Sequence, residues 1–155
     1  MRWKTSLIIF VMVLTASFAA AAPASADPIT AESAADCERG ANGFVDIPDG
    51  LTGEPVRVMV VGGFMTVTLY KGYVQGLRGW AHARGATQAG DLVWMDWTRD
   101  GGHSWIQCGP FVIPHSQATK TSAAQRTNPS PTWQFRACGM LRDQPRTTKC
   151  TQPWW

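Results

Sequence analysis

The segment with the most chemical potential in this sequence is 94–98, which reads Trp-Met-Asp-Trp-Thr. Indole rings stack on sugar rings or anchor protein partners, and Asp96 could accept hydrogen bonds from a ligand between them. If the segment is a strand, Trp94 and Trp97 point to opposite faces, whereas Asp96 shares a face with Trp94. Unless another element covers it, one of the two indoles is therefore expected on an outer face, within reach of a ligand.

Tryptophan is abundant beyond residue 26, and each indole has two possible roles. Core filling is favoured for any single tryptophan, because a small domain poor in Leu and Ile needs large apolar side chains. Asp96 also has a structural alternative, as the hydrogen-bonded partner of Arg136, Arg78 or an indole N–H. Our predicted binding residues are Trp94, Asp96, Trp97 and Trp133.

No catalytic set stands out. Ser116, His115 and Asp96 contain the residue types of a hydrolase triad, but no nucleophile-elbow sequence accompanies them. His82 and His103 have no evident partner, and the glutamates beyond residue 26 all lie in N-terminal, turn-rich sequence. No Cys-x-x-Cys pair or histidine cluster suggests a metal. We therefore predict no catalytic residue, no metal and no cofactor.

Residues 98–105 resemble an Asp-box, Ser/Thr-x-Asp-x-Gly-x-Ser/Thr-Trp, at every specified position. The resemblance implies a β-hairpin turn, and the residue types agree with it. A short Asp side chain accepts hydrogen bonds from turn amides, and Gly tolerates a positive φ. A structural turn is thus favoured over catalysis or calcium binding. The residues assigned to the turn are Thr98, Asp100, Gly102, Ser104 and Trp105.

Four further segments resemble a family of small secreted actinobacterial proteins with no assigned activity. They are Gly-Ala-Asn-Gly-Phe at 40–44, the stretch 90–97, Gln-Cys-Gly-Pro-Phe at 107–111 and the closing Trp-Trp. The resemblance covers most of the chain beyond residue 26. It implies a bacterial, exported β domain and adds no mechanism.

The N-terminus has the features of a secretory signal peptide. Arg2 and Lys4 precede the apolar run 7–14, and Ala24-Ser25-Ala26 is a small-x-small cleavage signal. We therefore predict a secreted protein that is cut after Ala26. The apolar run is too short to cross a bilayer, and no second one follows, so no membrane span is expected.

The four cysteines, an even number in an exported chain, predict two disulfides. We favour Cys138–Cys150, which closes a short loop rich in turn residues, together with Cys37–Cys108. The nested alternative pairs Cys108 with Cys138 and Cys37 with Cys150, and spacing alone does not reject it.

Beyond the leader, short alternating segments separated by turns predict an all-β fold, an antiparallel β-sandwich or a small barrel. Residues 27–36 are expected to be a flexible N-terminal segment, and 37–155 a single β domain. The polar stretch 114–131 is long for a loop in a compact domain and is either functional or mobile. The expected strands are 56–61, 64–70, 73–83, 92–98, 104–108 with a possible extension over 111–113, and 132–138.

Charge argues against a nucleic-acid partner. Without Arg2 and Lys4, the 14 basic residues fall to 12 against 11 acidic ones, and they are scattered along the chain. We predict a monomeric, non-enzymatic binding module of the cell envelope or extracellular space. Its expected partner is a polysaccharide, recognised through exposed tryptophans, or an extracellular protein. The alternatives are a secreted protease or enzyme inhibitor presenting 114–131, and a small secreted hydrolase using Asp96 or a histidine.

Overall fold

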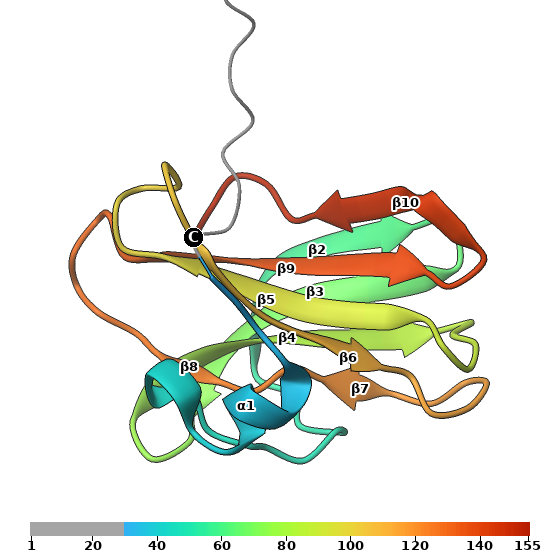
Figure 1. Cartoon of the computed structure of the whole chain (residues 1–155), viewed down its shortest axis with the longest axis horizontal. Helices are drawn as coiled ribbons and strands as arrows, with labels where there is room; N and C mark the ends of the chain where they lie inside the picture. The colour runs from blue at the N-terminus through green and yellow to red at the C-terminus, as the bar shows by residue number, and fades with distance from the viewer. Residues whose placement is uncertain (1–29) are drawn as a thin grey trace, which may run out of the picture.

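The computed structural model describes residues 30–155, which form two β-sheets packed face to face (Figure 1). Only two short helical segments accompany the strands, α1 (Ala34–Glu38) and the 3-10 turn η1 (Ala41–Gly43). The predicted all-β class is confirmed. The strands are β1 (Thr30–Glu32), β2 (Glu54–Val61), β3 (Met65–Tyr73), β4 (Leu77–Gly85), β5 (Leu92–Thr98), β6 (Ile106–Val112), β7 (Lys120–Thr121), β8 (Gln125–Arg126), β9 (Gln134–Leu141) and β10 (Gln144–Cys150).

The first sheet, here called the meander sheet, has the order β2-β3-β4-β7, with β8 also paired to β4. Its three long strands are consecutive antiparallel neighbours. Gly62 and Gly63 join β2 to β3 with positive φ values of 58° and 81°, which explains why glycine occupies this turn.

The second sheet, here called the mixed sheet, has the order β1-β6-β5-β9-β10. All its pairings are antiparallel except that of β1, which runs parallel to β6 with Thr30 opposite Ile106. Strand β5 lies at the centre, so the segment singled out in the sequence is flanked by a strand on each side.

Alternating residues of the two sheets fill the space between them. Met65, Val67 and Leu69 of β3 are fully buried in one core with Val93 and Met95 of β5. The sheets approach closely at Gly139, where an added Cβ would lie 2.8 Å from Val67 Cγ2. Because alternate residues of a strand point to opposite faces, Val93 and Met95 define the face of β5 that lies against the core.

A smaller cluster covers the outer face of the meander sheet. Tyr70 and Trp80 pack there against Ile47 and Ala124, from the segments before β2 and after β7. The Trp80 indole donates to the Leu51 carbonyl oxygen at 3.1 Å. Trp80 is thus a structural residue of this cluster.

The disulfides are Cys37–Cys108 and Cys138–Cys150, the favoured pairing of the sequence analysis. The first ties α1 to β6, and the second joins the neighbouring strands β9 and β10. Two disulfides indicate an oxidising compartment outside the cytosol. None of the helices within residues 30–155 is long and apolar enough to cross a membrane.

The structure differs from the sequence expectations at four segments. The expected strand 73–83 is divided, because β3 continues to Tyr73 and β4 begins only at Leu77. Residues 30–36, expected to be flexible, lie in β1 and the start of α1. Residues 144–150 form strand β10, which was not predicted because the segment contains turn-type and charged residues. The stretch 114–131 contains β7 and β8, and its residues 121–125 are buried. The predicted leader, 1–26, lies outside the described residues.

Candidate functional site

The predicted binding residues of β5 are buried. Trp97 is 4% exposed and belongs to the core between the sheets, where its ring packs edge-on against Phe44. Trp94 and Asp96 lie on the opposite face, at 9% and 2% exposure. That outer face was expected to leave an indole accessible, but other side chains cover it.

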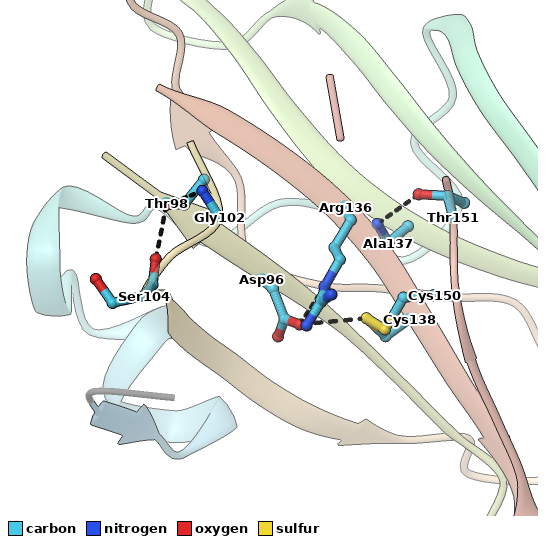
Figure 2. A network of polar contacts seen from close by, with 9 residues as sticks. All are labelled: Asp96, Thr98, Gly102, Ser104, Arg136, Ala137, Cys138, Cys150 and Thr151. Atoms are coloured by element: carbon cyan, nitrogen blue, oxygen red, sulfur yellow. Dashed lines mark hydrogen bonds and ion pairs between the residues drawn. A yellow bond between two sulfur atoms is a disulfide. The ribbon is translucent and has the colours of Figure 1, made fainter. Parts of the chain in front are cut away.

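Arg136 is one of the covering side chains. Its Nε donates to Asp96 Oδ2 at 2.8 Å (Figure 2). The guanidinium carbon lies 4.5 Å from the ring centre of Trp105 and 4.4 Å from that of Trp154. Arginine stacks favourably on indole faces, so these contacts hold the cation over Asp96. Of the structural partners considered for Asp96, the structure shows Arg136.

Burial dominates the electrostatics of this pair. It raises the pKa of the Asp96 carboxyl to about 6, although the nearby Arg136 guanidinium and, less strongly, the Trp94 side chain favour the charged form. Asp96 Oδ1 has no hydrogen-bond partner among the described residues. Because the carboxyl is closed to solvent, Asp96 cannot reach a substrate in this arrangement.

The Cys138–Cys150 disulfide lies against the same carboxylate (Figure 2). Cys138 Sγ is 3.5 Å from Asp96 Oδ2, but a disulfide sulfur carries no hydrogen to donate. Asp96, Cys138 and Cys150 are also a group of metal-ligand types close together. Neither sulfur is a thiolate while the disulfide is intact, so the group does not fit a metal.

The loop 98–105 is held by its own side chains (Figure 2). The Thr98 hydroxyl accepts from the Gly102 amide at 3.0 Å and lies 2.6 Å from the Ser104 carbonyl oxygen. The Asp100 carboxylate accepts from both the amide and the hydroxyl of Ser104, which lowers its pKa. Trp105 packs against Trp154 beside the turn. The side chains of Thr98, Asp100 and Ser104 are therefore hydrogen-bonded to one another or to the loop backbone, as expected for a structural turn.

The histidines do not assemble a catalytic set. His82 is 2% exposed, and neither ring nitrogen has a hydrogen-bond partner among the described residues. Burial lowers its pKa, which keeps the ring neutral. His115 Nδ1 contacts the Ser116 carbonyl oxygen, and Asp96 is paired with Arg136.

The fourth predicted binding residue, Trp133, lies at an open groove. Two adjoining hollows, with volumes of about 490 and 240 Å³, share Trp133, Thr127 and Asn128 as lining residues. The lining residues that the two hollows share belong to the segment that joins β8 to β9, which is the orange loop at the left of Figure 1. We call this feature the Trp133 groove.

Local hydrogen bonds fix the groove wall. The Trp133 indole donates to the Arg126 carbonyl oxygen at 3.0 Å, and its ring centre is 4.6 Å from that of Trp97. The Asn128 side-chain oxygen accepts from the Ser130 amide at 2.9 Å. Trp133 is therefore held by the core residue behind it, while part of its ring surface stays exposed to the groove.

Trp155 forms the end of the smaller hollow. Its backbone pairs with Phe135 through two hydrogen bonds of 2.7 and 3.0 Å, so it extends the edge of β9. The two rings also pack, with centres 5.8 Å apart. A second indole is thus positioned along the groove from Trp133.

Two arginines line the larger hollow, Arg78 of β4 and Arg126 of β8. They are directly opposed cross-strand partners, although 48 positions separate them in the chain. The sequence suggested Arg78 only as a possible partner of Asp96 and did not single out Arg126, because the cations are scattered along the chain and form no cluster. The two arginines meet because β8 pairs with β4. Strand β8 has only two residues and therefore shows no periodicity from which this pairing could be predicted.

Comparison with known proteins finds no match. No protein-family model, no curated protein and no solved structure is similar to this chain. Of the four residues predicted to bind, the structure places Trp133 at an accessible groove, and it buries Trp94, Asp96 and Trp97.

Proposed function

We propose that this protein is a secreted, non-enzymatic module that binds carbohydrate along the Trp133 groove. The main support is that the Trp133 indole lines two adjoining open hollows, with the Thr127 hydroxyl and the Asn128 amide beside it. Sugar rings combine apolar faces with hydroxyl edges. A groove that offers an aromatic surface and hydrogen-bonding side chains suits both parts of such a ligand.

Polar groups of the groove are free to take part. Asn128 is exposed, and its side-chain Nδ2 has no hydrogen-bond partner among the described residues. The Thr127 and Ser130 hydroxyls line the same wall, where they contact the Leu77 carbonyl oxygen at 3.1 Å and the Thr132 hydroxyl at 2.9 Å. Their oxygens keep lone pairs that can accept from a sugar hydroxyl. Because Trp133 is supported from behind by Trp97, its ring needs little ordering when a sugar binds, which favours affinity.

The alternatives have less support. An inhibitor presents an exposed loop, but residues 121–125 of the stretch 114–131 are buried against the body of the protein. The Ser122 amide donates to the Ala81 carbonyl oxygen at 2.9 Å, and Thr121 pairs with His82 of β4. A hydrolase using Asp96 would need this carboxyl to open to solvent.

Retention on polysaccharides tests the proposal. The panel is chitin, cellulose, peptidoglycan and soluble neutral and acidic polysaccharides in affinity gels. We expect retention on at least one of them, and a loss of about tenfold or more in affinity for Asn128→Ala and Trp133→Phe. Trp133→Phe keeps an aromatic ring against Trp97 but loses the donor to the Arg126 carbonyl oxygen, and Asn128→Ala loses the acceptor of the Ser130 amide. Circular dichroism and thermal unfolding therefore check that each variant is folded before its affinity is compared.

Gln88→Ala is the matched control. Gln88 lines a separate hollow, beside Phe64 and Leu141 at the opposite end of β9. It should be retained like the unmodified protein. Absence of retention on every polysaccharide, or retention that the groove variants leave unchanged, would overturn the proposed function.

A further inference from the structure

We infer that the Trp133 groove selects glycans that carry an acidic group, and that Arg78 and Arg126 form the anion-binding end of the groove. This inference rests on the proposed function and adds the ligand's chemical class. It follows from two cations that the fold places opposite each other without a counter-charge.

Arg78 is a buried cation with unused donors. It is 4% exposed, yet it lines the larger hollow. Its Nε donates to the Val74 carbonyl oxygen at 2.8 Å, and its Nη1 to those of Gly43 and Ala124 at 3.0 and 3.2 Å. Nη2 makes no hydrogen bond with a described residue. These bonds fix the guanidinium and leave one of its nitrogens for a ligand.

Arg126 adds a second positive charge at the same place. It lies directly opposite Arg78 across the β4–β8 pair, and side chains in such a pair point to the same face. Like charges in this position destabilise a sheet. Burial and, less strongly, the charge of Arg126 lower the pKa of Arg78, which means that the neighbouring cation disfavours the charged form of Arg78.

No described carboxylate neutralises these two cations. Within residues 30–155, no carboxylate lies within 4.0 Å of either guanidinium. Other described cations also lack such a partner, but Arg78 and Arg126 are directly opposed across a strand pair and line one hollow. An anion in the hollow would supply the missing charge. Two guanidinium groups match the oxygens of a carboxylate or a phosphate through charged hydrogen bonds.

The two indoles beside the arginines, Trp133 and Trp155, indicate that the bound anion is carried by a sugar chain. The Trp133 indole donates to the backbone carbonyl of Arg126, so the stacking surface and the cation are held together. The smaller hollow continues from Trp133 to Trp155. A uronate or phosphate-bearing sugar at the arginines would leave its neighbouring residues along the two indoles.

The test uses one polymer in two charge states. Polygalacturonate and its fully methyl-esterified form share a backbone, and only the first carries carboxylates. Phosphorylated dextran serves as the phosphate-bearing glycan, with unmodified dextran as its neutral counterpart. For the full chain, we expect at least one acidic polymer to bind about tenfold or more tightly than its neutral counterpart. Which acidic polymer binds distinguishes carboxylate from phosphate recognition.

Arg126→Gln should remove at least tenfold of that preference, and Arg126→Lys should restore part of it. Arg126 is exposed, so its replacement does not disturb the carbonyl contacts of Arg78. Arg146→Gln is the matched control. Arg146 lies exposed on β10, and its replacement removes one positive charge, as Arg126→Gln does. It should change affinity less than twofold.

Each remaining outcome has a separate meaning. Equal affinity for the charged and neutral forms, weakened by Asn128→Ala, overturns the acidic selectivity and leaves carbohydrate binding standing. Retention by neutral polymers alone also overturns the acidic selectivity and leaves carbohydrate binding standing. Binding of a single-stranded oligonucleotide through Arg126, with no polysaccharide retained, overturns both this inference and the proposed function. Binding of no probe also overturns both.

Discussion

Asp96 shows how a single side chain can give a folded β-protein a distinctive pH response. Its pKa is about 6 in the folded protein, because burial disfavours the charge, against an ordinary value of 3.8. Between these values the unfolded chain gives up the proton before the folded protein does. The contribution of Asp96 to stability is therefore largest below pH 3.8, falls through this window and is level above it.

Asp96→Asn removes this titration while keeping the shape of the side chain. We expect the free energy of unfolding of the unmodified protein, minus that of the variant, to fall by a few kcal/mol between pH 4 and pH 7, since one pKa unit corresponds to about 1.4 kcal/mol. Urea unfolding at a series of pH values measures it. A difference that is constant across this range would contradict the assignment.

Thr98 is a second residue whose effect follows from its contacts. Its hydroxyl is buried and accepts from the amides of Asp100 and Gly102 at 3.2 and 3.0 Å. Thr98→Val keeps the side-chain volume and leaves both amides without this acceptor. We expect a loss of about 1–3 kcal/mol in the free energy of unfolding. Thermal and urea unfolding would measure the change.

Thr148→Val is the control for that substitution. Thr148 is exposed, and its hydroxyl donates to the Pro145 carbonyl oxygen at 2.9 Å. Water replaces this contact, so the change should be within about 0.5 kcal/mol. If the two valine variants lost similar stability, the hydrogen bonds of Thr98 would not be what stabilises the loop.

At the scale of elements, strands with clear alternation were predictable, whereas the edge strand β10 and the two-residue strands were not. The bounds of β5 match the predicted strand 92–98, because its neighbours on both sides are turn residues. Strand β10 contains Pro145, Arg146 and Lys149, and its exposed edge position permits them. Two-residue strands such as β8 have no periodicity to detect.

The candidate site was predictable to the same limited extent. Trp133 was singled out for its residue type and its place in a strand pattern. Arg78 and Arg126 depend on a pairing between segments 48 positions apart, which a single sequence does not reveal. Alternation correctly placed Asp96 with Trp94 on one face of β5. It could not show that Arg136 and Trp154 cover that face.

The packing of one sheet on the other gives an element-scale prediction at Gly139. A Cβ there would meet Val67 Cγ2 at 2.8 Å and Met65 Cε at 3.0 Å, so Gly139→Ala must displace these core side chains or the strands that carry them. We expect a loss of about 1–3 kcal/mol in the free energy of unfolding, measured by urea unfolding.

Gly50→Ala is the matched control, because no heavy atom lies within 4 Å of its added Cβ and its φ is not in the left-handed region. It should change stability by less than about 0.5 kcal/mol. A Gly139→Ala protein as stable as Gly50→Ala would show that the core relaxes freely at this point.

For the whole molecule, the two disulfides should differ in their contribution to stability. Cys37–Cys108 spans 71 positions and Cys138–Cys150 spans 12. A longer closed loop restricts the unfolded chain more, so removing the first pair should cost about 4 kcal/mol and removing the second about 3 kcal/mol. Paired Cys→Ala variants in urea unfolding test the order. A larger loss for the short-loop variant would contradict it.

The same two disulfides carry a consequence for how the protein matures. Each joins cysteines that are consecutive in the chain, the first with the second and the third with the fourth. A chain that enters an oxidising compartment from its N-terminus presents Cys37 and Cys108 before Cys138 and Cys150. Oxidation in order of arrival therefore yields the native pairs directly. Maturation by this route requires a thiol oxidase and no disulfide isomerase.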